Sequence, residues 1–226
     1  MNSNKNVLHV ILTVVLFGAI WGLLEATVGY ILHFLPATIS GLVMFPIGAT
    51  LMYWAYHSTQ KKSAIIYVGL IAAAIKAVNF AMPLPAAGPI KVLNPMISIV
   101  LQSLVVFGFS FLFERKTNPV KVALLQIGLI ALAIVSWRAL FLVNQSINYA
   151  ITGNLPGQLK SIATMADFTL LNGLYELLIL GSIYGIYRLV SSLLARKNII
   201  LKAPHWLVYT LAPLTLVAAI LAVVLK

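Results

Sequence analysis

The chain has 226 residues, of which 62% are hydrophobic and only 8% are charged. A soluble domain carries about 25% charged residues, so the composition excludes an ordinary soluble protein. The formal net charge is +11, but the basic residues are spread over separate short connections. A nucleic-acid site would gather them on one face. We therefore expect a protein embedded in a lipid bilayer, with no nucleic-acid partner.

Hydrophobic runs recur along the chain, and each is continuous and long enough to cross a ~30 Å hydrocarbon core as a helix. The predicted spans are 7–34, 37–57, 64–82, 92–114, 119–144, 166–192 and 204–225. The sequence thus predicts an all-α fold, a polytopic membrane helical bundle of about seven transmembrane helices. Residues 1–226 are expected to form a single membrane domain, with a six-helix core over 7–192 and an additional C-terminal helix over 204–225.

The connections between these spans alternate in basic charge. Positive side chains concentrate before the first span and after the second, fourth and sixth, at Lys5, Lys61, Lys62, Arg115, Lys116, Lys121, Arg196, Lys197 and Lys202. Cytoplasmic loops of membrane proteins carry the excess of Lys and Arg. We therefore predict a multi-pass protein of the cell membrane, with a cytoplasmic amino terminus and a carboxyl terminus outside.

Four charged side chains lie inside predicted spans, namely Glu25, Lys76, Arg138 and Glu176. A charge near the bilayer centre costs about 2.5–3.5 kcal/mol on insertion scales, so it is rarely kept without a partner or a function. The predicted orientation places all four in the outer half of the membrane. Because two are acidic and two are basic, they either pair and hold the bundle together or line a cavity that meets a polar or zwitterionic solute.

Further candidates for such a cavity are polar or aromatic side chains close to these charges. They share a helical face with a charge or lie in the outer half of the fourth span. These candidates are Trp21, Asn79, Asn172, Asn94 and Gln102. Together with the four charges they predict a substrate-binding pocket open to the outside. The Pro- and Gly-containing connections 82–95 and 146–165 are suited to cover it.

Enzyme chemistry finds little support in the sequence. Asp167 is the only aspartate, and no histidine lies at the depth of Ser182 to activate it. The four histidines are scattered near span ends, and no P-loop is present. We therefore expect no catalytic residue, no metal site and no cofactor. Any dependence on ATP has to come from a partner chain.

The size, the hydrophobicity, the segment GAIWGLLE at residues 18–25 and the outer polar site resemble the substrate-binding (S) components of energy-coupling factor (ECF) transporters. These are small prokaryotic membrane proteins with a cytoplasmic amino terminus and a site for a vitamin or related solute in the outer half. The resemblance covers spans one to six and implies a transmembrane coupling subunit and ATPase subunits as partners. Such components usually have six spans and commonly carry alanines four apart in the first helix, where this chain has Ala19 and Leu23.

The favoured function is therefore the solute-binding component of a small-molecule uptake transporter. Two alternatives stay open, a membrane-bound lipid-modifying enzyme and a structural or assembly subunit of a membrane complex. A recognisable nucleophile or base would favour the enzyme. Complete mutual pairing of the four charges, without a cavity, would favour the structural subunit.

Overall fold

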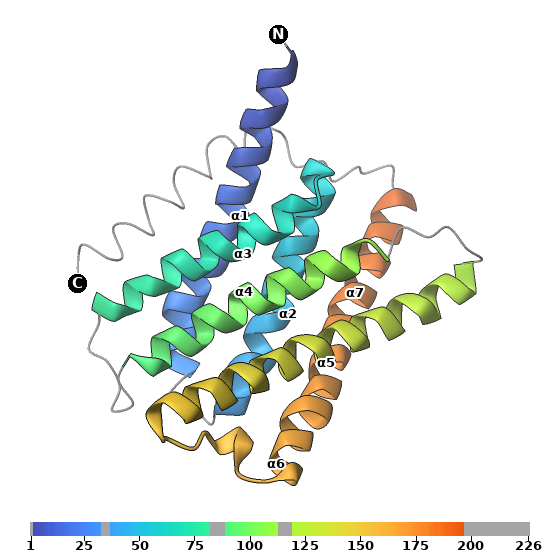
Figure 1. Cartoon of the computed structure of the whole chain (residues 1–226). Coiled ribbons are helices and arrows are strands. Elements are labelled where there is room, and N and C mark those ends of the chain that lie inside the picture. Colours follow the sequence, from blue (N-terminus) through green and yellow to red (C-terminus); the bar gives the residue numbers. More distant parts are fainter. Residues whose placement is uncertain (1, 33–36, 82–88, 113–118, 197–226) are drawn as a thin grey trace.

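The structure, a computed structural model, describes residues 2–32, 37–81, 89–112 and 119–196 (Figure 1). Every regular element in these ranges is helical, which confirms the all-α prediction. The long helices are α1 (Asn2–Leu32), α2 (Ala37–Thr59), α3 (Ser63–Lys76), α4 (Ile90–Ser110), α5 (Pro119–Thr152) and α7 (Asn172–Arg196). The short elements are η1 (Ala77–Ala81), η2 (Gly157–Leu159), α6 (Ile162–Ala166) and the π-helical turn η3 (Asp167–Leu171).

Five helical stretches in the described residues are long and apolar enough to cross a membrane. They are Val7–Gly29, Ser63–Ala81, Ile90–Ser110, Leu125–Thr152 and Ile162–Ile183. These stretches overlap five of the predicted spans, and α2 coincides with a sixth, so the molecule is a helical protein suited to a membrane. The predicted run 204–225 lies outside the described residues, and the count of seven stays a prediction.

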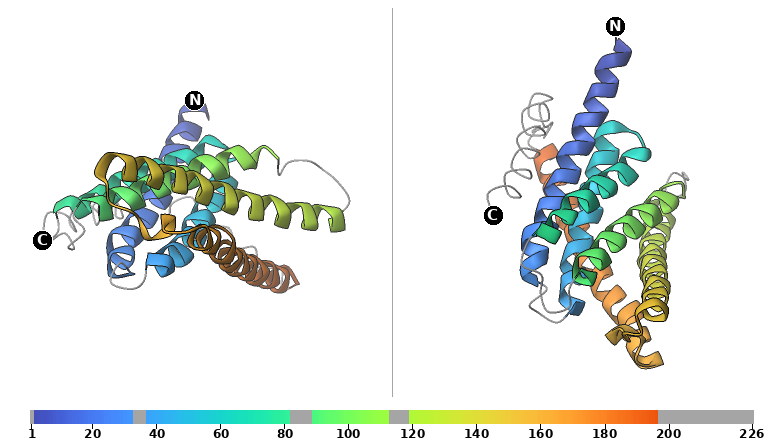
Figure 2. Two further views of the ribbon diagram at one scale, coloured as in Figure 1. Left: turned by 60° about the horizontal axis from the view of Figure 1, so that its bottom comes forward. Right: turned by 60° about the vertical axis from the view of Figure 1, so that its left-hand side comes forward.

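The long helices form two layers of three (Figures 1 and 2). In one layer α3, α4 and α5 lie side by side, and in the other α1, α2 and α7 do so. The layers meet where α1 packs against α3, where α2 packs against α3 and α4, and where α7 packs against α5. Consequently α2 and α4 occupy the middle of the bundle. The facing helices α1 and α3 lie on one side of them, and α5 and α7 lie on the other.

Glycines on α1 allow it to pack closely against α3. A Cβ at Gly18 would lie 2.8 Å from Ile71 Cβ, and one at Gly22 would lie 2.7 Å from Ile75 Cβ. Real Cβ atoms do not approach other atoms so closely, so the helices could not pack this way with larger residues. Small residues at helix contacts are a common basis of helix association in membranes. The close packing brings the end of α3 next to Glu25 on α1.

The structure extends α5 eight residues past the predicted end at residue 144, to Thr152. The hydroxyls of Ser146 and Thr152 donate to main-chain carbonyls four residues earlier, so these polar side chains are satisfied within the helix. The helix stops at Gly153, whose φ of +69° lies in the left-handed region that favours glycine. The connection predicted over 146–165 is therefore partly helical.

The sixth predicted span, 166–192, is not one regular helix. It begins in α6, where Ser161 and Thr164 form a reciprocal capping box. The π-helical turn η3 follows, in which the Asn172 N–H donates to the Asp167 carbonyl five residues earlier. Single π-helical turns inside helices are frequent at functional sites. Here the turn packs against α5, next to the buried guanidinium of Arg138.

Candidate functional site

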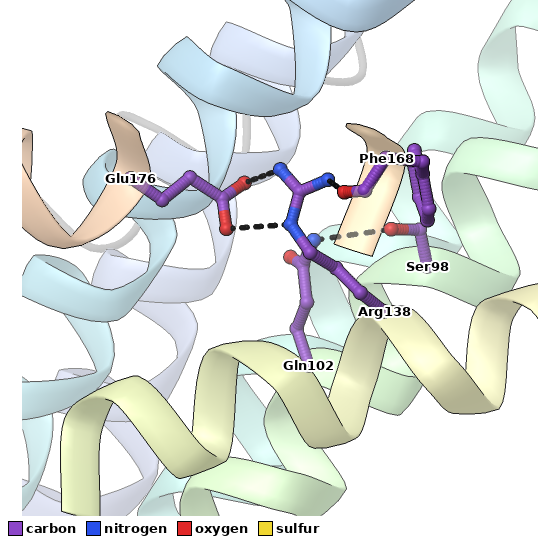
Figure 3. Close-up of polar contacts among 5 residues, drawn as sticks. All are labelled: Ser98, Gln102, Arg138, Phe168 and Glu176. Atoms are coloured by element: carbon purple, nitrogen blue, oxygen red, sulfur yellow. Dashed lines mark hydrogen bonds and ion pairs between the residues drawn. The ribbon is translucent and has the colours of Figure 1, made fainter. Parts of the chain in front are cut away.

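Arg138 of α5 and Glu176 of α7 form a bidentate ion pair (Figure 3). Arg138 Nη2 lies 2.7 Å from Glu176 Oε1, and Arg138 Nε donates to Glu176 Oε2 at 3.1 Å. Arg138 Nη1 donates to the main-chain carbonyl of Phe168 in η3. The two side chains are only 1% and 0% exposed. This fork-to-fork geometry is the strong form of a carboxylate–guanidinium pair, and it ties α5, α7 and η3 together.

Aromatic rings enclose the Arg138 guanidinium. Its Cζ lies 4.9 Å from the ring centroid of Trp137 and 4.7 Å from that of Phe168, within the range of cation–π attraction. Phe141 packs against both rings, and Phe45 of α2 packs against Trp137. The charges of this pair are therefore satisfied by each other and by their immediate protein neighbours.

Lys76 and Glu25 lie at the opposite side of the bundle, between α3 and α1. Lys76 Nζ donates to the main-chain carbonyl of Glu25 at 2.5 Å. The Glu25 carboxyl is close enough to the Lys76 ammonium and to the Trp21 indole to interact electrostatically with both. A Cβ at Gly29 would lie 2.9 Å from Glu25 Oε2 and 3.7 Å from Lys76 Nζ. The absence of a side chain at Gly29 thus lets the Glu25 carboxyl and the Lys76 ammonium lie against the main chain of α1.

Two polar atoms next to these charges have no hydrogen-bond partner in the described part of the chain, Trp21 Nε1 and Asn79 Oδ1. Asn79 is held in place because its Nδ2 donates to the Ala26 carbonyl at 3.4 Å. Both side chains are buried, Trp21 with 0% and Asn79 with 2% of its surface exposed. An unsatisfied buried polar atom costs about 1–3 kcal/mol. Trp21, Glu25, Lys76 and Asn79, called here the α1–α3 polar site, thus offer an unused acceptor, Asn79 Oδ1, and an indole N–H that interacts with the Glu25 carboxyl, beside two opposite charges.

In the structure the four predicted charges form two separate pairs, Glu25 with Lys76 and Arg138 with Glu176. Each pair connects the two layers, one through α1 and α3 and the other through α5 and α7, while α2 and α4 lie between these helix pairs. Trp21 and Asn79 belong with the first pair, as the sequence predicted for their helical faces. Asn172 is buried at the start of α7, one turn before Glu176 of the second pair.

The two remaining candidates lie on α4 and contact neighbouring polar side chains. Asn94 Oδ1 accepts from Asn148 Nδ2 of α5 at 3.3 Å. Gln102 Nε2 donates to Ser98 Oγ at 3.0 Å (Figure 3). These residues therefore lie on the α5 side of the bundle and not with the α1–α3 polar site.

Sequence reasoning missed three contributors to these contacts. The Phe168 carbonyl becomes available through a π-helical turn, for which the sequence has no signal that we recognise. Asn148 was placed in a connection because the predicted fifth span ended too early. Ser98 was overlooked, although its spacing of four residues from both Asn94 and Gln102 marks one polar face of α4.

A hollow of about 250 Å³ opens between α3 and α4. Its lining is entirely apolar and consists of Ala73, Leu93, Met96, Ile97, Val100 and Leu101. None of the predicted site residues lines it, so this hollow is not the polar pocket that the sequence predicted.

No protein-family model, curated protein or solved structure matches the chain. The resemblance to ECF S components therefore stays a prediction. Function has to be inferred from the geometry of the two charge pairs and their neighbours.

Proposed function

We propose that this chain is the membrane-embedded solute-binding component of a small-molecule uptake transporter. The observation that carries the proposal is the α1–α3 polar site, where Asn79 Oδ1 is buried without a hydrogen-bond partner in the described residues, beside the Trp21 indole, Glu25 and Lys76. Buried polar groups are normally hydrogen-bonded. One that lacks a partner in the described chain and lies beside two opposite charges is typical of a ligand site.

The chemistry of this site limits the solute. Glu25 and Lys76 carry opposite charges, so a strongly charged solute would have no counter-charge among helices of low polarity. A neutral or zwitterionic molecule with one donor satisfies Asn79 Oδ1, and an acceptor group on the same molecule would share the Trp21 N–H with the Glu25 carboxyl. Vitamin-like molecules and other small polar solutes meet this description.

The contacts of the Arg138–Glu176 pair favour a structural role for this pair. Its bidentate contact and the bond to the Phe168 carbonyl engage Nε and both terminal nitrogens of the guanidinium. We propose that this pair holds α5, α7 and η3 together and does not bind solute. The four charges would then divide between the two interpretations that the sequence left open, one pair for the solute and one for the bundle.

Uptake against a gradient needs an energy source, and the sequence has no nucleotide-binding motif. In line with the resemblance to S components, we propose a transmembrane coupling subunit and ATPase subunits as partners. Ala19, at the alanine position of the resemblance, is fully buried and packs with Leu23 against Ile71 and Ile75 of α3. A coupling subunit would therefore dock on another face of α1.

A binding screen tests the proposal. Purified protein in detergent would be heated with a panel of water-soluble vitamins, amino acids and nucleobases, and compounds that raise the unfolding temperature would be measured by calorimetry. We expect at least one stabilising compound. The free energy of binding this compound should weaken by roughly 1–3 kcal/mol in Glu25→Gln or Asn79→Leu, because each substitution removes one polar contact.

Thr27→Val is the matched control for this screen. Thr27 lies on the same helix, but it is exposed and bonds only to the Leu23 carbonyl of its own turn. This variant should bind as the wild type does. The proposal is wrong if no compound stabilises the protein, or if a stabilising compound binds the two site variants as tightly as it binds the control.

A further inference from the structure

Polar side chains line the contact between α4 and α5, away from the α1–α3 polar site. On α4 they recur at every fourth residue, and on α5 at intervals of seven and three, so each set occupies one helical face. We call this set the α4–α5 polar row. Its members are Asn94, Ser98 and Gln102 on α4 and Arg138, Gln145 and Asn148 on α5.

One hydrogen bond fixes the register of α4 against α5 along the row. Asn148 Nδ2 donates to Asn94 Oδ1 at 3.3 Å, and the two helices run in opposite directions. Moving one turn along α4 from Asn94 therefore leads to Ser98, which is level with the turn around Gln145. A second turn leads to Gln102, which is level with the turn of α5 that follows Arg138. The row thus runs from the amino-terminal end of α4 to the Arg138–Glu176 pair.

Burial increases along the row. Asn94, Ser98 and Asn148 are partly exposed, whereas Gln102 and Gln145 are each 4% exposed. The innermost member, Arg138, is 1% exposed. The row is therefore more open at the amino-terminal end of α4 and closes at the ion pair.

Helix adhesion alone does not explain this many polar groups. Hydrogen bonds between membrane helices contribute little on average, whereas polar side chains cost free energy when they are buried away from water. Asn144, one turn before Asn148, keeps its Nδ2 buried without a hydrogen-bond partner in the residues that the structure describes. Ser98 and Gln102 bond to each other within α4 instead of reaching across to α5. The row therefore has more hydrogen-bonding capacity than the contact between the helices uses.

We propose that the α4–α5 polar row is a water-filled passage that admits water and small neutral polar molecules as far as the Arg138–Glu176 pair. Amide and hydroxyl groups both donate and accept hydrogen bonds, so they replace the hydration of a neutral molecule. The only charge in the row, on Arg138, is already paired with Glu176 and does not attract ions strongly. The proposal concerns helices outside the α1–α3 polar site, so it stands or fails independently of solute binding there.

Thiol accessibility tests this passage, because the chain has no cysteine and any introduced thiol is unique. Ser98→Cys changes the side chain little in size and places a thiol inside the row. Val143→Cys is the matched control, since Val143 is level with Ser98 but 57% exposed on the outer face of α5. Both variants would be treated in lipid vesicles, open to reagent on both sides, with the neutral reagent hydroxyethyl methanethiosulfonate. Labelling would be followed by mass spectrometry, with denatured protein as the reference for full labelling.

Methanethiosulfonates react with the thiolate, which forms in water and not in lipid. We expect Ser98→Cys to be labelled at least about tenfold faster than Val143→Cys, because only the former thiol would face water. Slow labelling of both would mean that the row is dry, and fast labelling of both would mean that this level is outside the bilayer; either result overturns the proposal. Asn148→Cys repeats the test if Ser98→Cys does not fold. Faster labelling of the row by the anionic sulfonatoethyl reagent than by the neutral one would contradict the preference for neutral molecules.

Discussion

The two buried charge pairs differ in how their charged groups are bonded, although each has a tryptophan Nε1 beside it, of Trp21 or of Trp137, without a hydrogen bond in the described residues. Arg138 and Glu176 satisfy each other in two contacts, and a third contact fixes the guanidinium to η3. Lys76 instead donates to the main-chain carbonyl of Glu25, and Asn79 Oδ1, which has no hydrogen-bond partner in the described residues, lies nearby. Substitutions in the two pairs should therefore have different consequences.

Removing one member of the Arg138–Glu176 pair should destabilise the fold strongly. Arg138→Met leaves the Glu176 carboxylate buried without its counter-charge, and we expect the free energy of unfolding to fall by about 3–5 kcal/mol. The double variant Arg138→Met, Glu176→Leu removes both charges and should recover most of this loss, because apolar residues can replace a buried pair at little cost. Denaturant unfolding in detergent measures both effects. If the double variant loses as much as the sum of the single variants, the two side chains do not act as a pair.

Two isosteric substitutions separate binding from stability. Glu25→Gln should weaken solute binding by roughly 1–3 kcal/mol and should lower the unfolding temperature less than Glu176→Gln does, because the Lys76 bond to the main chain of residue 25 survives the substitution. Glu176→Gln should lower the unfolding temperature and leave the affinity of the folded protein unchanged. Calorimetry and thermal unfolding on both variants check this. The reverse pattern would move the solute site to the α5–α7 side.

The sequence predicted that these four charges are buried, because a charged side chain inside a membrane span almost always faces the interior of the bundle. It could not predict the partners of each charge. Lys76 meets Glu25 only because Gly18 and Gly22 let α3 approach α1, and this approach depends on how the helices pack. Arg138 meets Glu176 only because α5 and α7 lie side by side.

The contact between α1 and α3 depends on the small size of its glycines. Gly22→Ala would bring a Cβ within 2.7 Å of Ile75 Cβ and 3.1 Å of the main chain at Ala72, so the helices would have to separate. We expect a loss of about 1–3 kcal/mol in the free energy of unfolding. Separation of the helices should also weaken solute binding, since it pulls Lys76 away from Glu25.

Gly108→Ala on α4 is the control for this contact. No atom lies within 4 Å of a Cβ placed there, so the substitution introduces no clash. Alanine favours a helix over glycine by about 1 kcal/mol, so this variant should be as stable as the wild type or slightly more stable. Equal destabilisation by Gly22→Ala and Gly108→Ala in thermal unfolding would contradict close packing at α1–α3.

Long apolar runs predicted most of the helices, but two local features were not predictable from them. Polar residues at 146–152 predict a connection, yet hydroxyl bonds to the preceding turn and the Asn94–Asn148 contact keep them helical. The π-helical turn at Asp167–Leu171 interrupts an apolar run whose composition is that of an ordinary span. Both features depend on contacts with other helices.

The basic connections predict an orientation in the membrane, which can be measured on the same cysteine-free chain. Lys61 lies in the connection after α2, and Lys160 lies directly after η2. The predicted orientation places these two positions on opposite sides of the membrane. We predict that a cysteine at position 61 reacts with an impermeant reagent only from the cytoplasmic side, and one at position 160 only from outside. If residue 160 reacts from the cytoplasm, the two charge pairs change sides of the membrane and a site open to the outside is excluded.

The two-layer packing of α1, α2 and α7 against α3, α4 and α5 separates the charges that the sequence suggested would gather in one pocket. If the α1–α3 polar site holds a solute, one small molecule should remain with the protein through gentle purification. Native mass spectrometry of wild-type protein and of Asn79→Leu, both purified from cells grown in rich medium, tests this. We predict one bound small molecule per wild-type chain and its loss from the variant. An unliganded wild-type chain, or the same bound molecule in equal amount on the variant, would contradict solute binding at this site.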